Sequence, residues 1–135
     1  MSTSCIIIIR DKKPSENVIK LFHRQDGYPK GVGKFLLEEV IQKRLEKCEY
    51  YTVDDVANFL VKNEDDRTYM VTGAKHPDSQ YRYFIFVDTK EILCQQIHYE
   101  KVMRHFELTV DREIDLKEEL KQISTPKHSC SELTK

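Results

Sequence analysis

Apolar runs and polar turns alternate along this chain, and their periods predict strands at both ends of a helical middle. Cys5 to Ile9 is a continuous run of mostly β-branched residues, which is typical of a strand buried on both faces. Polar turn residues separate it from the apolar run 18–23, so we expect these two strands to form a hairpin. From about residue 30 to residue 48 the apolar residues recur three and four positions apart, which predicts a helix packed on the sheet.

A second helix is predicted to begin at Thr52. Asp55 follows three residues later, and the two form an acidic version of the capping box. The apolar residues between positions 53 and 61 then fall on one helical face. We therefore expect a short amphipathic helix with a well-defined first turn.

The second half of the chain returns to strand patterns. Strands are predicted over 68–72, 80–87, 91–99 and 106–110, and the segment 99–106 is also compatible with a helix. In residues 81–87 the apolar and mixed positions alternate, so one side of that strand is core and the other is at least half covered. Asp111 is expected to cap a last short helix that carries three spaced apolar residues, Leu116, Leu120 and Ile123.

This order of elements, β-β-α-α-β-β-β-α, predicts an α+β fold. Strands in hairpins with the helices grouped together indicate an antiparallel or mixed sheet with helices packed on one face. The sequence suits a single α+β domain over residues 1–123, followed by a flexible polar tail over 124–135.

Composition narrows the classes of function. The chain has 22 Lys and Arg against 23 Asp and Glu, a net charge of −1, so no overall field favours nucleic acid or anionic lipid. The apolar run at 6–9 is too short for a signal sequence or a membrane span. The four cysteines are more than 30 positions apart, which predicts reduced thiols and neither disulfides nor a zinc site. We expect a cytoplasmic protein without membrane attachment or cofactor, and we regard nucleic acid as an improbable partner.

One loop stands out because it holds three of the four glycines. Its sequence is Asp26-Gly27-Tyr28-Pro29-Lys30-Gly31-Val32-Gly33-Lys34, and it leads directly into the first predicted helix. Asp-Gly permits a turn with positive φ and Pro fixes φ on the far side, so Tyr28 is held between two constraints. Free amides at the helix start, with lysines nearby, would suit an anion such as phosphate, although a tight strand-to-helix connection explains the same residues equally well.

The predicted ligand-binding residues are those of this loop. Arg24 and Lys34 would contact the anion, Asp26 would hold the loop, and Tyr28 would stack or pack. The glycines would let the ligand approach the backbone. The set is Arg24, Asp26, Gly27, Tyr28, Gly31, Gly33 and Lys34.

The Asp-Gly-Tyr-Pro motif, with the hydrophobic strand before it and the glycines after it, resembles a group of small proteins encoded by bacteriophages, prophages and bacterial mobile elements. The resemblance covers about the first 45 residues. Many of these proteins place a His and an aromatic residue just before the Asp, whereas this chain has Arg24 and Gln25 there and His23 one position earlier. The resemblance implies an origin in a mobile element and carries no biochemical activity.

Other candidate constellations are weaker. His23 and Asp26 would form a metal site only with a third ligand such as Asp65 or Asp66, and no spacing fixes one. A second group lies close in sequence without a named acid–base partner: His98, Glu100 and His105. The chain also has a set of five aromatic residues, which is more typical of a core than of a base-stacking platform. A stacking role would require Arg82 to lie beside the exposed members of the set on an uncovered sheet face. That set is Tyr69, Tyr81, Tyr83, Phe84 and Phe86.

Three hypotheses follow. The leading one is a non-enzymatic accessory protein of a phage or mobile element that binds a host or defence protein or a small anionic, nucleotide-like ligand. The first alternative is a small hydrolase or nucleotide-processing enzyme that uses His23 and Asp26. The second is a structural or oligomeric protein whose aromatic sheet face is its interface, with a homo-oligomer as one form of it.

Overall fold

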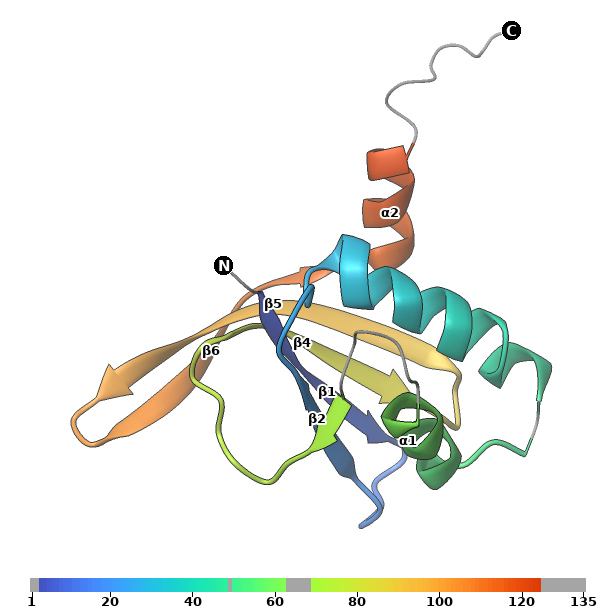
Figure 1. Ribbon diagram of the computed structural model, residues 1–135, viewed down its shortest axis with the longest axis horizontal. Coiled ribbons are helices and arrows are strands. Elements are labelled where there is room, and N and C mark those ends of the chain that lie inside the picture. Colours follow the sequence, from blue (N-terminus) through green and yellow to red (C-terminus); the bar gives the residue numbers. More distant parts are fainter. Residues whose placement is uncertain (1–2, 49, 63–68, 125–135) are drawn as a thin grey trace, which may run out of the picture.

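The fold is a single twisted sheet with helices on one side. The computed structural model describes residues 3–48, 50–62 and 69–124 (Figure 1). The predicted polar tail lies outside the described residues, except for Ser124, which is the last residue of α2.

Six strands make up the sheet, in the order β3-β2-β1-β4-β5-β6. Only β1 and β4 are parallel, and the other neighbours are antiparallel, which confirms the α+β fold with a mixed sheet. The predicted hairpin of the first two strands is confirmed, since Ile7 faces Leu21 across β1 and β2. The strands are β1 (Ser4–Arg10), β2 (Ile19–His23), β3 (Tyr69–Val71), β4 (Ser79–Phe86), β5 (Glu91–Val102) and β6 (His105–Ile114).

The first predicted helix is wound more widely than expected. It consists of η1 (Pro29–Gly33) and η2 (Leu36–Gln42), both π-helical, and a 3-10 turn, η3 (Leu45–Lys47). Bonds that span five residues support this winding, for example from the Lys43 amide to the Glu38 carbonyl at 3.1 Å. The predicted apolar stripe is still the buried one, because residues four and five apart also share a face in such a helix.

The two later helices differ in how well the sequence places them. In α1 (Val53–Val61) the predicted capping box is present, with bonds of 3.0 and 3.1 Å between Thr52 and Asp55. The start of α2 (Leu116–Ser124) corrects the prediction, because Asp115 and not Asp111 provides the cap. Asp111 instead lies within β6, which continues four residues beyond the predicted strand.

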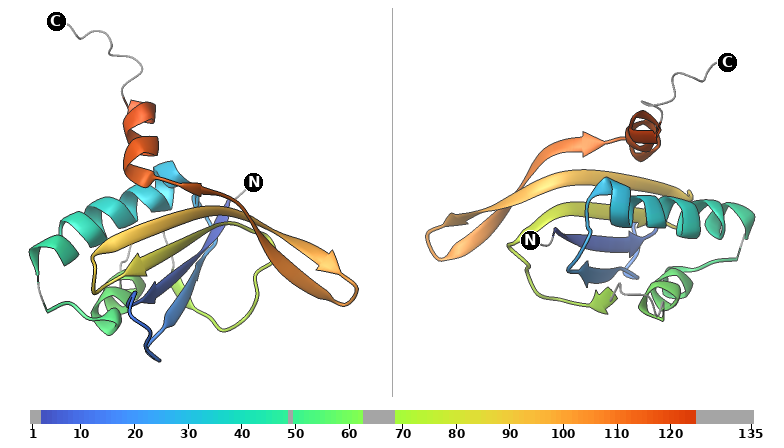
Figure 2. Two further views of the ribbon diagram at one scale, coloured as in Figure 1. Left: turned by 180° about the vertical axis from the view of Figure 1, so that it is seen from behind. Right: turned by 45° about the horizontal axis from the view of Figure 1, so that its top comes forward.

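The helices and the core lie on one face of the sheet. Figure 2 shows the helical segment η1–η3 crossing β4 and β5 on the side where α1 also lies. Alternate residues of the central strands point into this layer and are fully buried, among them Ile7, Ile9, Tyr83 and Ile85. They pack against the buried side of η1, η2 and α1 in one core cluster.

The opposite face of the sheet has only a partial cover. The loop between β3 and β4 lies over its β2 end, where His76 stacks on Phe22 with ring centroids 3.9 Å apart. Toward β4 and β5 this face carries half-buried side chains, Phe84 and Phe86 among them. None of the described helices packs on it.

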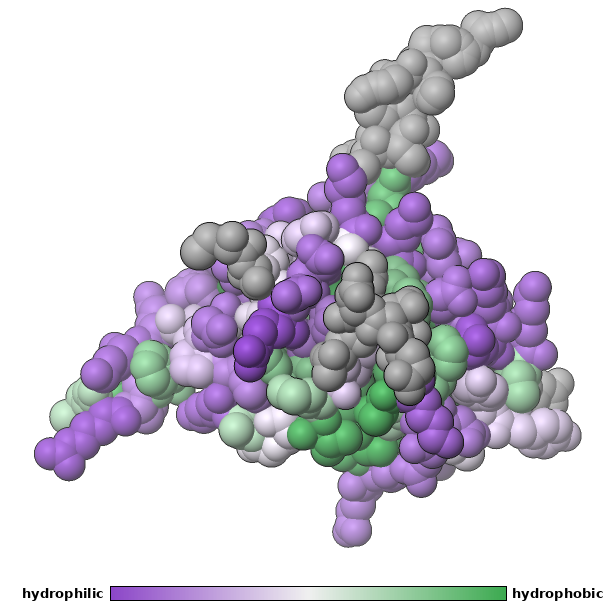
Figure 3. Space-filling view, viewed as in Figure 1, coloured by the Kyte–Doolittle hydropathy of each residue, from purple (hydrophilic) through white to green (hydrophobic). Residues whose placement is uncertain are grey.

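Two further regions present apolar residues to solvent. Figure 3 shows hydrophobic residues gathered where β3 lies beside α1, and Val61 and Val71 are exposed there by 46% and 68%. The segment 63–68, which joins these elements, lies outside the described residues. The β5–β6 hairpin extends away from the body to a tip at Met103, and it replaces the alternative helix over 99–106.

Candidate functional site

The Asp-Gly-Tyr-Pro loop forms a tight turn that is bonded to the first strand. Its positive φ of 55° falls on Asp26, while none of the described glycines has a positive φ. The Gly27 amide donates to the Thr3 carbonyl at 2.8 Å, and the Tyr28 hydroxyl donates to the Asp26 carboxylate at 3.0 Å. The loop thus contains the predicted turn with a positive φ, and Tyr28 is constrained as expected. The Tyr28 side chain is 38% exposed.

Gly27 is where the loop meets the core. The buried Tyr83 hydroxyl donates to the Gly27 carbonyl at 2.7 Å. A Cβ on Gly27 would lie 2.8 Å from the Cβ of Cys5, which is closer than real contacts allow. The absence of a side chain at this position is explained by packing against β1, without any ligand.

The other two glycines of the loop are also enclosed by protein atoms. A Cβ on Gly31 would collide with the Asp26 backbone carbonyl. A Cβ on Gly33 would lie 2.9 Å from a Leu116 methyl and 3.1 Å from the Tyr83 hydroxyl. Close packing against other residues of this chain explains why both positions are glycine.

The amides that were expected to be free at this helix start are already hydrogen-bonded. Gly31 and Gly33 both donate to the Tyr28 carbonyl, at 2.9 and 3.4 Å, and Val32 donates to the Asp26 carbonyl at 2.8 Å. The Lys34 amide also bonds to carbonyls of η1. An anion would therefore have to break these bonds, so only exposed side chains such as those of Arg24 and Lys34 remain for it.

His23 and Asp26, the pair of the enzyme alternative, lie in opposite environments. His23 is 2% exposed and stacks on Tyr69 with centroids 4.5 Å apart. Asp26 is exposed. A general base needs access to the substrate proton, and a residue this deeply buried does not have it in this conformation.

The histidines of the hairpin contact separate carboxylates. His98 lies 2.8 Å from Asp111 and 3.6 Å from Glu100, and all three are partly or fully exposed. His105 pairs instead with Glu107 at 3.0 Å. Within the described part of the chain, no group of three His, Cys, Asp or Glu residues is arranged to hold a metal ion.

The side of the sheet on which no described helix packs carries a row of apolar and aromatic side chains, and we call it the aromatic face. Register places Ile8, Phe84 and Leu93 side by side on β1, β4 and β5, and all three are half-buried. Phe86 stacks beside Phe84, with centroids 5.9 Å apart and ring planes within 6°. The aromatic face consists of Ile8, Arg82, Phe84, Phe86 and Leu93.

Arg82 lies beside the exposed aromatic residues. This is the arrangement that a base-stacking role of these residues would require. Its guanidinium lies 4.9 Å from the centre of the Phe84 ring and donates two hydrogen bonds to Gln95, at 2.7 and 2.9 Å. Burial lowers the pKa of this guanidinium, and the neighbouring Tyr99 opposes the effect. Tyr69 and Tyr83, two other members of the predicted aromatic set, belong to the buried core.

Positive charge surrounds the aromatic face. Lys12 lies 5.8 Å from the Phe86 ring centre and pairs with Glu91 at 3.1 Å, and this hydrogen bond lowers the pKa of the Glu91 carboxyl. Register also places Lys20 beside Ile8, and Arg10 beside Phe86, on the same side of the sheet. The rim thus holds Arg10, Lys12 and Lys20 together with two carboxylates, Glu91 and Glu113, the latter placed beside Gln95 on the same side of the sheet.

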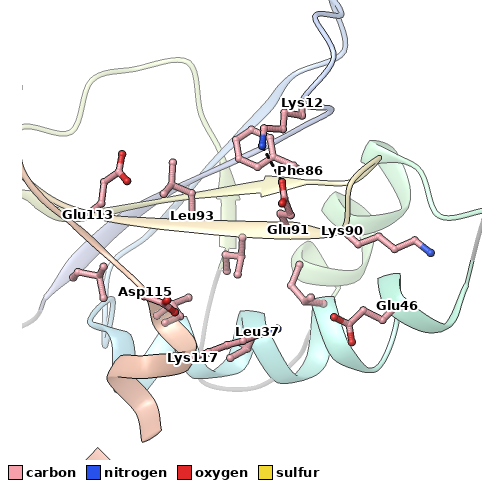
Figure 4. Close-up of a pocket in the computed structure, with 14 residues that line it drawn as sticks. Lys12, Leu37, Glu46, Phe86, Lys90, Glu91, Leu93, Glu113, Asp115 and Lys117 are labelled. Carbon is pink, nitrogen blue, oxygen red and sulfur yellow. Dashed lines mark hydrogen bonds and ion pairs between the residues drawn. The ribbon is translucent and has the colours of Figure 1, made fainter. Parts of the chain in front are cut away.

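A groove at the outer edge of β5 was not foreseen from the sequence. Its volume is about 670 Å³, and it lies between β5, η2 and the start of α2 (Figure 4). Sequence periodicity identifies its apolar lining as core residues. It does not show that β6 ends short of the beginning of β5, which is what leaves the groove open.

No helix in the described ranges is both long and apolar enough to cross a membrane. Comparisons with protein-family models, with curated proteins and with solved structures give no match for this chain. Its class is therefore defined by its own geometry: an α+β protein with a mixed sheet, one side of which is covered by helices and the other by half-exposed aromatic residues.

Proposed function

We propose that this chain acts by binding and not by catalysis, and that its aromatic face docks a protein partner. The observation that supports this most is the row of Ile8, Phe84 and Leu93, which lies half-exposed at the middle of a sheet face with no described helix over it. Aromatic residues in a contiguous apolar surface are typical of the centre of a protein interface.

A protein partner fits this surface better than a nucleic-acid base. A stacking platform needs open ring faces, but Arg82 already lies over Phe84 and Lys12 over Phe86. The loop of residues 26–34 supports a small anion as the ligand less well than the aromatic face supports a protein, because the amides at the helix start are already hydrogen-bonded within the chain. An apolar protein surface needs neither open rings nor free amides.

The charges define the partner's chemistry further. Three cations rim the face besides Arg82, against two carboxylates, Glu91, which pairs with Lys12, and Glu113, which lies beside Gln95. We therefore propose a partner with an apolar centre and a rim of carboxylates, since such complementarity raises the association rate and fixes orientation. If the resemblance to phage and mobile-element proteins holds, that partner would be a host or defence protein.

The test compares two variants of the full chain, Phe86→Glu at a half-buried position and Tyr50→Glu at an exposed one. Tyr50 is 84% exposed and is a matched aromatic control, because it precedes α1 on the helical side of the sheet. We expect a protein that co-purifies from the native host with the wild type and with Tyr50→Glu, and that is lost with Phe86→Glu. Equal retention by both variants would contradict the proposal.

The same proteins should be run in sedimentation velocity, because a second copy is the competing occupant of this face. We expect a monomer in all three cases. A wild-type dimer that dissociates in Phe86→Glu would assign the face to self-association and overturn the proposal of a different partner. Thermal unfolding of both variants checks that the fold is retained.

A further inference from the structure

Among the described strands, one part of β5 has a partner on only one side. Glu91, Ile92 and Leu93 pair with β4, through Phe86, Ile85 and Phe84 respectively. On the other side, β6 pairs with β5 only from Cys94 onward, where Cys94 faces Ile114. After Ile114 the chain turns away through Asp115 into α2, so no described strand continues alongside residues 91–93.

An unpaired strand edge exposes backbone donors and acceptors. In a strand these groups point alternately to the two sides, so the outer side of residues 91–93 carries groups that no described strand bonds. A polypeptide in extended conformation is the ligand that complements such an edge, because its own backbone repeats at the same spacing.

The groove beside this edge has an apolar wall. Leu37 and Ile41 of η2, Ile92 of β5, Ile114 and Leu116 line it, and of these only Ile92 is half-buried, the others being 2–4% exposed. Figure 4 shows Leu37 on the helix facing the β5 edge across the groove. Because side chains alternate along a strand, an added strand would place every second residue against this wall.

Charge distinguishes the two ends of the groove. Glu113 and Asp115 lie at the end where β6 stops, and Lys90 and Glu46 lie together at the other (Figure 4). One end is thus acidic, whereas the opposite end holds one charge of each sign, and Lys117 stands on the α2 side. A bound segment that carries a basic residue at the acidic end would complement it.

We infer that this groove binds an extended segment of a partner protein by strand addition to residues 91–93, antiparallel to β5. The segment would have aliphatic residues at alternate positions and a basic residue at its start, next to Glu113. This inference depends on the open β5 edge, which adjoins the aromatic face because Phe86 and Leu93 line both surfaces, and it goes beyond the proposed function.

The experiment titrates the isotope-labelled full chain with a capped peptide, Lys-Val-Thr-Ile-Thr-Val-Ser, and follows backbone amide resonances. We expect weak binding, with shifts concentrated at Ile92, Leu93 and Lys90 and none at the hairpin tip around Met103. A peptide with the same sequence but N-methylated at alternate amides should bind at least roughly tenfold more weakly, since it cannot complete the backbone bonds. Equal binding of the methylated peptide, or shifts elsewhere, would overturn strand addition.

A charge exchange tests the orientation. Replacing the first residue of the peptide by Glu should weaken binding to the wild type about fivefold, and Glu113→Lys should reverse that preference. An unchanged preference in the variant would refute the antiparallel placement. Concentration-dependent self-association of the free chain that the peptide competes away would assign the edge to a second copy and overturn the inference.

Failure here is separable from failure of the proposed function. Because Phe86 also lines the groove, Phe84→Glu is added as a variant of the aromatic face outside that lining, whereas the peptide titration tests the edge with no partner present. If the peptide binds but the face variant keeps its partner, the proposed function is wrong. If the face variant loses its partner but the peptide does not bind, strand addition is wrong.

Discussion

Removing one buried hydroxyl should test whether the Asp-Gly-Tyr-Pro loop is held by the core. In Tyr83→Phe the Gly27 carbonyl loses its 2.7 Å hydrogen bond and stays buried without that donor. Leaving a buried group unsatisfied costs about 1–3 kcal/mol. For a chain of 135 residues this corresponds to a fall in Tm of roughly 3–5 °C for each kcal/mol.

Urea unfolding, followed by circular dichroism, measures this change directly. Tyr50→Phe is the control, because a change at a residue that is 84% exposed should alter the free energy of unfolding by less than about 0.5 kcal/mol. We expect the Tyr83→Phe midpoint to fall with an unchanged slope. A loss below about 0.5 kcal/mol in Tyr83→Phe would refute the argument that this bond fastens the loop to the sheet.

Three further predictions concern the loop, the thiols and one turn. Gly31→Ala should destabilise the fold by about 1–3 kcal/mol, as measured by urea unfolding, because its Cβ would collide with a backbone carbonyl, and stability equal to the wild type would contradict this. Cys5 and Cys94 are fully buried, and burial raises the pKa of Cys94 to about 12, so both should resist labelling by a thiol reagent at pH 8, while the half-buried Cys48 reacts before either of them. Equal labelling rates for these three cysteines in peptide mapping would disprove the burial. Backbone amides hold the pKa of Asp88 below its usual value, so the stability it contributes is present above about pH 4 and is lost as the pH falls through its folded pKa. The stability gap between the wild type and Asp88→Asn should therefore narrow below about pH 4 in acid-unfolding curves, and a constant gap would contradict this.

Local interactions explain what could be predicted from the sequence. The capping box at Thr52 involves residues three positions apart, so the start of α1 was correct. The alternation in β4 likewise placed Arg82, Phe84 and Phe86 together on the face opposite the core. In both cases the pattern that defines the structure lies within one short segment.

Long-range register explains what could not. The parallel pairing of β1 with β4 joins segments separated by about 70 residues, and the open edge of β5 depends on β6 ending opposite Cys94. The free amides expected at the first helix were wrong for a related reason. That helix start is π-wound and its turn bonds back to Tyr28 and Asp26, and none of this has a distinct sequence signal.

Asp111 illustrates how one residue type suits two roles. An acidic residue before an amphipathic run is typical of a helix cap, and both Asp111 and Asp115 fit that pattern. The longer β6 decides between them. It incorporates Asp111 at an irregularity of the register, where its carboxylate contacts His98 at 2.8 Å, and it leaves Asp115 to accept a hydrogen bond from the Glu118 amide at 3.2 Å. The predicted strand ended four residues too early, at residue 110, and this placed the cap on Asp111.

Photo-crosslinking in the native host tests the central claim, that the aromatic face receives a protein partner, most directly. A photoreactive phenylalanine analogue is placed at Phe86 in one protein and at Tyr50 in another, and adducts are identified by mass spectrometry. We predict one adduct with a different protein at Phe86, weakened when Arg82→Glu is added, and none of the same mass at Tyr50. Identical adducts at both positions, or none at Phe86, would contradict the account.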